Sequence, residues 1–321
     1  MATVEVEAEE TAAATKLQAI ERGKLERAKV AQLKAQASAD ASSAQAASRA
    51  QSLRVAVVGA TGGVGKHVVG KALDLGLEVV AIARSVDRIS PLSHPSLTKR
   101  AFDFSDCEGG TEELAGFLEG AALVISCVGN RRSVSPPNGA ENHLIIAKAT
   151  KSLMMAMERA RAPRLAIISS LGVGDSWMQL LRLGWVGVYF SAKFATAMRE
   201  DRDDLECAET LALGGPSGLL GGGLPHERPE GVSVVVCRPA GLSNAPGDGK
   251  YQVALADGIV GPSISREDVA SFLLTLTTDL QYDNGAVSVG ANAPRKSSSS
   301  SLGSQHRHST FALAKLDVYE A

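Results

Sequence analysis

The stretch Gly59-Ala60-Thr61-Gly62-Gly63-Val64-Gly65 decides the fold, because an apolar run precedes it and an amphipathic segment follows it. The apolar run, residues 53–58, predicts a buried strand, and residues 66–75 predict a helix. Glycines in the turn between them let a bound group approach the backbone, and the helix N-terminus offers N–H groups to an anion. The sequence therefore predicts a strand, a glycine turn and a helix that together hold a diphosphate.

The glycine spacing is G-x-x-G-x-x-G, with Thr61 where the common dinucleotide fingerprint has its second glycine. The fingerprint is thus met in part, and a glycine-rich turn that binds nothing is the alternative. The strand and helix on either side favour the diphosphate site. We expect its residues to be Gly59, Thr61, Gly62, Gly63, Val64 and Gly65.

A second buried strand is predicted over residues 77–83, and its end lies about 20 residues after the glycines, where such folds meet the adenosine ribose. No acidic residue stands at that end; the chain has Arg84, Ser85 and, one turn later, Arg88. A guanidinium suits a ribose 2′-phosphate because its planar fork makes paired, charge-assisted hydrogen bonds. We therefore expect NADP(H) rather than NAD(H), with solvated surface arginines as the alternative.

Composition narrows the class of protein. The chain has 321 residues and a formal charge of −2, without a dense basic tract, so a nucleic-acid partner is not expected. Residues 178–190, the longest apolar stretch with few charges, contain Arg182 and are too short to cross about 30 Å of hydrocarbon. Residues 1–10 are acidic and lack the apolar core of a leader, so we expect a cytoplasmic protein.

The cysteines favour a reducing compartment and no metal site. None of the four is part of a C-x-x-C pair, and two fall within predicted buried strands, where a small core residue is the simplest interpretation. The four are Cys107, Cys127, Cys207 and Cys237.

We expect a single domain at residues 53–292 with an extension at each end. Residues 1–52 are Ala-rich and predict a solvated helix or disorder, with a partner-binding helix as the alternative. Residues 214–231 are rich in Gly and Pro and are predicted to be an insertion. Residues 293–321 are predicted to be a Ser-rich tail.

Within the domain, apolar strands alternate with helical segments, which predicts a doubly wound, mostly parallel α/β sheet covered on both faces. A further helix is predicted to begin after Ser265, which can cap the N–H of Asp268. The strands are expected at residues 53–58, 77–83, 98–104, 121–128, 164–169, 232–237 and 285–289.

Ligands of such sheets bind outside the carboxyl ends of the strands, so the residues after each strand are candidate cofactor contacts. We expect Asp103 and Phe104 to border the adenine, and Val128 and Gly129 to let the ribose approach. Ser169 and Ser170 end a strand where a nicotinamide would lie, although ordinary capping of the next turn explains these serines as well.

Several motifs together resemble those of the atypical short-chain dehydrogenase/reductases, in the NAD(P)H-binding, NmrA-like group that includes biliverdin and flavin reductases. The resemblance covers residues 53–292 and implies a Rossmann fold with NADP(H), but no particular substrate. The motifs are Gly59 to Gly65, Arg84, Asp103, Ile167-Ile168-Ser169-Ser170-Leu171-Gly172-Val173, Cys237-Arg238-Pro239-Ala240-Gly241-Leu242 and Ile264-Ser265-Arg266-Glu267-Asp268-Val269-Ala270.

The resemblance also suggests a catalytic set. Catalytically complete relatives use a Tyr acid, a Lys four residues later and an upstream Ser that polarises the carbonyl. Tyr189, Lys193 and Ser170 have that order and spacing. Two alternatives stay open: Tyr189 packs on the sheet while Lys193 is solvated or touches the cofactor, and a conjugated acceptor is reduced by positioning alone with a proton from solvent.

The segment that follows Ser170 is the expected wall of the substrate pocket. Its aromatic residues, Trp177 and Trp185, suit a planar apolar ligand, with burial in the core as the alternative.

We therefore predict an NADPH-dependent oxidoreductase that reduces a small planar or conjugated acceptor, such as a quinone, flavin, tetrapyrrole or carbonyl. A non-catalytic NADP(H) sensor or scaffold, with a protein partner bound through the N-terminal helix or the 214–231 insertion, is the alternative.

Overall fold

The computed structural model of the protein describes residues 53–90, 93–104, 110–129, 144–215, 228–255 and 258–292. The predicted extension at 1–52, the tail at 293–321 and most of the insertion at 214–231 lie outside these residues.

One sheet organises the described domain, and its strands lie in the order β3-β2-β1-β4-β5-β6-β10-β8. Every neighbouring pair is parallel except β10 with β8. The expected doubly wound, mostly parallel α/β fold is confirmed. The strands are β1 (Arg54–Val58), β2 (Glu78–Ala83), β3 (Leu97–Ala101), β4 (Ala121–Ser126), β5 (Arg164–Ile168), β6 (Ser233–Pro239), β8 (Tyr251–Ala254) and β10 (Gly285–Ala291).

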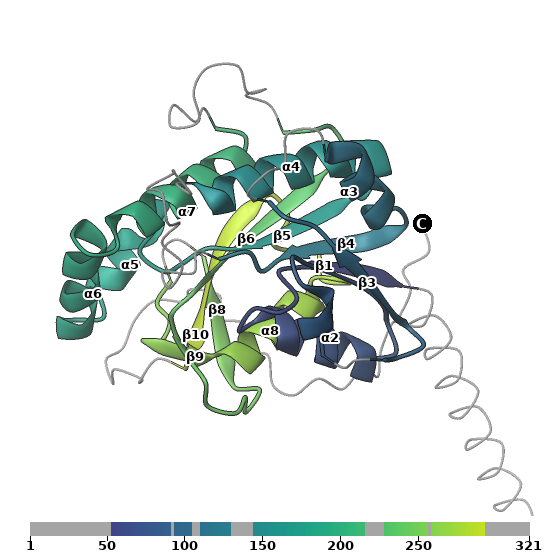
Figure 1. Ribbon diagram of the computed structural model, residues 1–321. Helices are drawn as coiled ribbons and strands as arrows, with labels where there is room; N and C mark the ends of the chain where they lie inside the picture. Colours follow the sequence, from purple (N-terminus) through teal and green to yellow (C-terminus); the bar gives the residue numbers. More distant parts are fainter. Residues whose placement is uncertain are drawn as a thin grey trace, which may run out of the picture. The chain divides into compact units, whose positions relative to one another are not determined.

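The central strands are nearly continuous runs of buried apolar residues because helices cover both faces of the sheet. In Figure 1, α3, α4 and α7 lie above the sheet, whereas α2 and α8 lie below it, packed against each other. The helices are α2 (Gly65–Asp74), α3 (Thr111–Leu118), α4 (Ile145–Ala160), α5 (Trp177–Leu181), α6 (Trp185–Ala195), α7 (Arg199–Ala212) and α8 (Arg266–Thr275), with 3-10 turns η1 (Val86–Arg88) and η2 (Gly174–Ser176).

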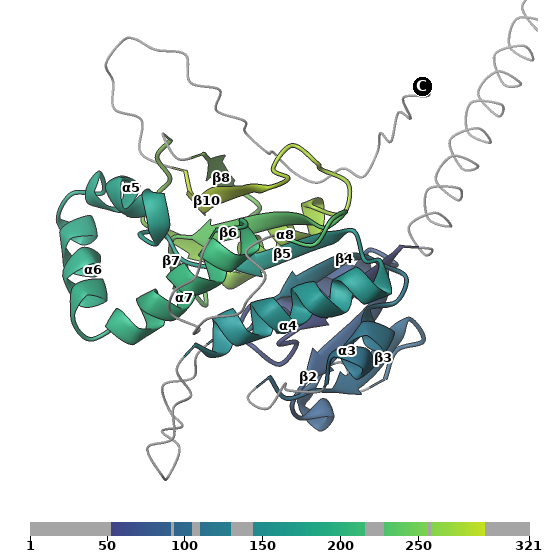
Figure 2. The same ribbon diagram turned by 90° about the horizontal axis from the view of Figure 1, so that it is seen from above.

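Helices α5 and α6 form a hairpin at one side of the domain. They lie beyond the sheet in both views, at the left of Figure 1 and Figure 2. The two helices pack closely where Gly187 meets α5, because a Cβ at Gly187 would lie 1.8 Å from the carbonyl oxygen of Leu180. Gly187 and Phe194 are the buried residues of α6, so this helix touches the rest of the domain through a narrow face.

The helix predicted after Ser265 is confirmed, since the Ser265 hydroxyl accepts a hydrogen bond from the Asp268 N–H at 2.9 Å. Three strands were not predicted: β7 (Gly241–Ser243), β9 (Ser263–Ser265) and the antiparallel β8. The first two have three residues each and form a separate parallel pair, which is too short for a periodic pattern to indicate. The strand predicted at 232–237 continues to Pro239, which places Arg238 inside β6.

No helix in the described part of the chain is long and apolar enough to cross a bilayer.

Candidate cofactor and active site

The strand order of the sheet reverses between β1 and β4, and sheets of this kind bind ligands at the carboxyl ends of the strands beside such a reversal. The glycine turn begins there. Gly59 has φ +74°, and a Cβ on it would lie 2.7 Å from the carbonyl oxygen of Cys127, just after β4. A Cβ on Gly65 would lie 2.3 Å from the carbonyl oxygen of Gly59. Only glycine fits these two positions, because the contacts are with backbone atoms.

The N-terminus of α2 is open to an anion. Its N-cap residue is Val64, no side chain caps the helix, and no acidic residue lies in the first turn. The N–H groups of Thr61, Gly63 and Val64 make no hydrogen bond within the described residues. By contrast, Ser265 caps α8. A free helix N-terminus with a closely approachable backbone fits a diphosphate.

A cation that sequence reasoning missed lies against this turn. A Cβ on Gly63 would lie 2.8 Å from Nε of Arg266, at the start of α8. The guanidinium is held by Asn244, whose Oδ1 accepts from Nη1 at 2.7 Å. Arg266 is part of the motif at residues 264–270, but the sequence does not predict its contact with Gly63, because the two residues are far apart along the chain and no local pattern joins them.

The end of β2 has the expected basic character. Arg84 and Arg88 are both exposed, and the guanidinium group of neither makes a hydrogen bond or ion pair within the described residues. Both guanidinium groups are therefore available to an anionic ligand beyond the strand end.

The residues after β3 and β4 differ in accessibility. Asp103 is exposed, whereas Phe104 is buried, with its ring centroid 4.7 Å from that of Phe102 in the core. Val128 is half-buried and packs against the same core, and Gly129 is exposed, so that a Cβ placed on it would have no other atom within 4 Å. Asp103 and Gly129 thus present accessible surface at the sheet edge, while Phe104 contributes to the core behind it.

Ser169 carries an unsatisfied polar atom at the end of β5. The residue is buried, and its Oγ makes no hydrogen bond within the described residues. Ser170 is half-buried, and its Oγ donates to the carbonyl oxygen of Leu171 at 3.3 Å. A buried hydroxyl without a partner is costly, so Ser169 is suited to a ligand amide placed at this strand end.

The structure brings Tyr189 and Lys193 together on α6, as their spacing indicates. Lys193 Nζ lies over the Tyr189 ring, 4.9 Å from its centroid, and both side chains are exposed. No hydrogen bond within the described residues joins Ser170 to either of them. The ammonium therefore contacts the ring of the tyrosine, and the two residues form part of an exposed surface.

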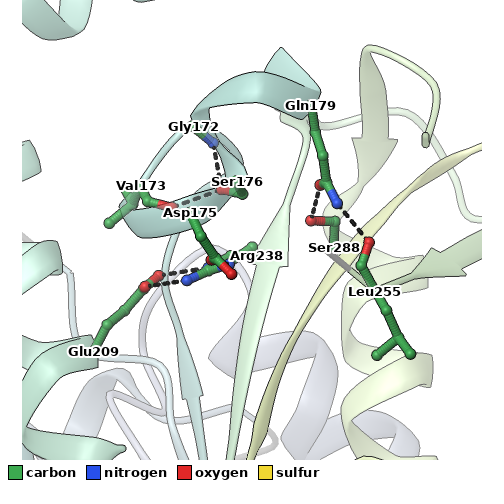
Figure 3. Close-up of polar contacts among 9 residues, drawn as sticks. All are labelled: Gly172, Val173, Asp175, Ser176, Gln179, Glu209, Arg238, Leu255 and Ser288. Carbon is green, nitrogen blue, oxygen red and sulfur yellow. Dashed lines mark hydrogen bonds and ion pairs between the residues drawn. The ribbon is translucent and has the colours of Figure 1, made fainter. Parts of the chain in front are cut away.

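An ion cluster around the buried Arg238 side chain holds the segment after β5, and Figure 3 shows it. Arg238 on β6 donates to both carboxylate oxygens of Glu209 on α7, at 3.0 and 2.6 Å, and also to Asp175 in η2. Burial by itself lowers the pKa of Arg238, but the hydrogen bonds and charge of Glu209 outweigh it, and the pKa is raised. A Cβ on Gly174 would meet this guanidinium at 2.7 Å, so the turn wraps closely around the cluster.

A second polar anchor fixes α5. The Gln179 amide donates to the carbonyl oxygen of Leu255 and accepts from the Ser288 hydroxyl of β10, each at 2.5 Å (Figure 3). The segment between Gly172 and Gln179 is therefore tied to two strands of the sheet.

Two of the described cysteines, Cys127 and Cys237, are unsuited to thiolate chemistry. Burial raises the pKa of the Cys127 thiol to about 12, and Cys237 is fully buried with its pKa raised for the same reason. Within the described residues, no three His, Cys, Asp or Glu side chains gather in a way that would hold a metal ion.

The parallel sheet, its reversal point and the glycine turn define the class as a dinucleotide-binding Rossmann domain. Residues 59–206 match the protein family described as NAD(P)H-binding. This match agrees with the resemblance seen in the sequence.

Solved structures share the fold at low sequence identity. The oxidoreductase YlbE from Lactococcus lactis has a TM-score of 0.54 at 19% identity, covering 75% of this chain and 91% of its own. ChuY from Escherichia coli O157:H7, an anaerobilin reductase, has a TM-score of 0.54 at 22% identity, covering 76% of this chain and 100% of its own. SP1627 from Streptococcus pneumoniae TIGR4, a proposed NADH-flavin reductase, has a TM-score of 0.52 at 17% identity, covering 75% and 100%. No curated protein matches the sequence.

Proposed function

We propose that this protein is an NADPH-dependent oxidoreductase that reduces a small planar or conjugated acceptor. The uncapped N-terminus of α2 at the glycine turn carries the proposal, because its free N–H groups fit a diphosphate. The match of residues 59–206 to the NAD(P)H-binding family and the likeness in fold to reductases, ChuY among them, support it.

The preference for NADPH is inferred from the end of β2. Arg84 and Arg88 are exposed and unpaired within the described residues, and no acidic residue follows the strand directly. A 2′-phosphate would pair with these guanidinium groups, whereas the 2′-hydroxyl of NADH would meet an arginine, not a carboxylate, at the residue that directly follows β2. Asp103 and Gly129 would border the adenosine, and Arg266 would add positive charge beside the turn.

When bound, the reduced nicotinamide supplies a hydride to the acceptor. The buried Ser169 hydroxyl would orient the carboxamide of the cofactor, and Ser170 would orient the acceptor. The exposure of Tyr189, with Lys193 over its ring, favours a reaction in which the proton comes from solvent. The protein then acts by holding the two reactants in contact, which suits a conjugated acceptor that stabilises the added electron pair itself.

The cofactor assignment is tested by titrating the full chain with NADPH and NADH. For Arg84→Ser we expect NADPH affinity to fall about 10- to 100-fold, the value of a hydrogen bond between charged groups, while NADH affinity stays the same. Arg199→Ser, which removes an exposed arginine at the start of α7, is the matched control. Equal loss of both nucleotides, or no loss at all, would contradict the assignment.

The proton source is tested with Tyr189→Phe. Consumption of NADPH is followed with a panel of quinones, flavins, tetrapyrroles and carbonyls, and we expect the variant to turn over the accepted substrate at the rate of the unchanged protein. A drop in kcat of about a hundredfold or more would assign the acid role to Tyr189 instead. Tight NADPH binding without consumption of any acceptor would favour the sensor alternative.

A further inference from the structure

The α5–α6 hairpin exposes an unusual amount of apolar surface. Of the eleven large hydrophobic residues that are exposed in the described part of the chain, six lie within this one hairpin. Trp185 is 89% exposed and Trp177 is 52% exposed. The six are Trp177, Met178, Trp185, Val186, Val188 and Tyr189, which we call the hairpin patch.

The composition of α6 does not match its surroundings. The sequence Trp185 to Ala195 is apolar around the whole helix, with Lys193 as its one charged residue. A helix of that composition is normally buried on all sides, yet α6 buries only Gly187 and Phe194. Large apolar patches on a protein surface mark places where another molecule binds.

The hairpin is also firmly attached to the domain. Gln179 on the inner side of α5 is buried and bonded to Ser288 and to Leu255, while Phe194 and Leu180 pack in a common apolar cluster. The patch residues therefore point outward, because the opposite side of the hairpin packs against the rest of the domain.

The charges around the patch indicate which surface it fits. Residues 176–198 contain Arg182 and Lys193 and no aspartate or glutamate, although the whole chain has a net charge of −2. The next residue, Arg199, forms an ion pair with Asp203 on its own helix at 3.8 Å and is not counted with them. Lys193 lies over the Tyr189 ring, with its charge beside the apolar surface. Tryptophan and tyrosine with flanking cations are typical of segments that lie in the headgroup region of a bilayer, where anionic lipids attract the cations.

We propose that the hairpin patch binds reversibly to the surface of a membrane that contains anionic lipids. Trp177, Trp185 and the neighbouring apolar side chains enter the boundary between headgroups and acyl chains, and the cations pair with lipid phosphates. Binding of this kind needs no helix that crosses the bilayer, and none of the described helices is long and apolar enough to do so.

Tryptophan fluorescence tests this directly, because Trp177 and Trp185 are the only two tryptophans in the chain. The full chain is mixed with vesicles of phosphatidylcholine alone, or of phosphatidylcholine with phosphatidylglycerol. We expect the emission to move to shorter wavelength and the protein to sediment with the mixed vesicles. Both effects should be weaker with phosphatidylcholine alone and should decrease as salt is added.

The double variant Trp177→Ser, Trp185→Ser should remain in the supernatant. Both side chains are more than half exposed, so the fold is expected to persist, which circular dichroism and thermal unfolding check. Leu280→Ser, which removes a 64% exposed leucine outside the hairpin, is the matched control and should sediment like the unchanged protein.

Three outcomes would overturn the proposal. One is an unchanged emission with no sedimentation on either vesicle, and another is full sedimentation of the double variant. The third is a shift in emission that follows protein concentration without vesicles, which would show that a second copy covers the patch.

Discussion

Gly65 is the residue on which the geometry of the glycine turn depends most directly. Its missing Cβ leaves room for the carbonyl oxygen of Gly59, and a methyl group there would meet backbone that cannot rotate away. Gly70 lies on the same helix with nothing within 4 Å of its Cβ position. Substituting each glycine in turn therefore distinguishes the steric effect of a side chain in the turn from the effect of helix propensity on stability.

We expect Gly65→Ala to lower the free energy of unfolding by about 1 to 3 kcal/mol, the usual cost of inserting a methyl group into packed structure, and to weaken NADPH binding. Gly70→Ala should instead raise it by up to about 1 kcal/mol, because alanine favours the helix. Urea denaturation and nucleotide titration of both variants measure this. Two variants of equal stability and affinity would show that the turn tolerates a side chain.

Arg238 illustrates a residue whose importance depends on a distant partner. Its guanidinium and the Glu209 carboxylate are both almost fully buried, so neither charge is compensated by water when the other is removed. Arg238 belongs to a motif seen in the sequence, but its pairing with Glu209 was not predicted. The two residues are 29 positions apart, and no spacing rule connects them.

For Glu209→Ala we expect a loss of about 3 to 5 kcal/mol in the free energy of unfolding, since it leaves a buried cation with only the exposed Asp175 for a partner. Glu206→Ala, on the exposed side of the same helix, should change it by less than about 0.5 kcal/mol. Urea denaturation at neutral pH compares them. Equal small effects would mean that water reaches Arg238.

At the scale of elements, α4 is capped by a different helix. Its first N–H groups, those of Ile146 and Ala147, donate to the two carboxylate oxygens of Asp204 on α7 at 3.0 and 2.9 Å. Burial raises the pKa of Asp204, and the two hydrogen bonds only partly oppose this. The cap thus joins α4 to α7 with a group that would hold a proton more readily than in the unfolded chain.

This predicts a particular pH dependence. A pKa that is higher in the folded protein stabilises it below the ordinary Asp value of about 3.9, and that stabilisation is lost as the pH rises through the raised pKa. The stability of the unchanged protein relative to Asp204→Asn should therefore decrease from acidic towards neutral pH. Urea denaturation over this range measures it, with the exposed Asp74→Asn as control. A difference that grows with pH would contradict the raised pKa.

The sequence predicted the elements that local pattern determines. Each of the seven strands predicted was found, because buried parallel strands are continuous apolar runs bounded by turns. The short strands β7 and β9 and the antiparallel β8 were missed, since their pairing depends on residues elsewhere in the chain. In the same way, the glycine turn was evident from the sequence, whereas Arg266 beside it was not.

At the scale of the whole described domain, the prediction of a parallel sheet was right because one alternation runs through the chain from β1 to β10. For the aromatic residues after Ser170, the sequence left two alternatives open, a wall of the substrate pocket and burial in the core. Trp177 and Trp185 are not core residues, since both are largely exposed. Hydrophobicity indicates that a residue will be covered, but it does not show whether its own chain or another molecule will cover it.

The two edges of the sheet have a consequence for aggregation. The sheet ends on β3 at one side, where Lys99 and Arg100 are adjacent, and on the four-residue β8 at the other. The loop before β8 is tied down, because the N–H of Gly247 donates to Glu267 and that of Gly249 to Asp268. Charged or very short edge strands are poor templates for a strand from another molecule. The two edges of the described sheet are therefore poor starting points for a continuous sheet between copies.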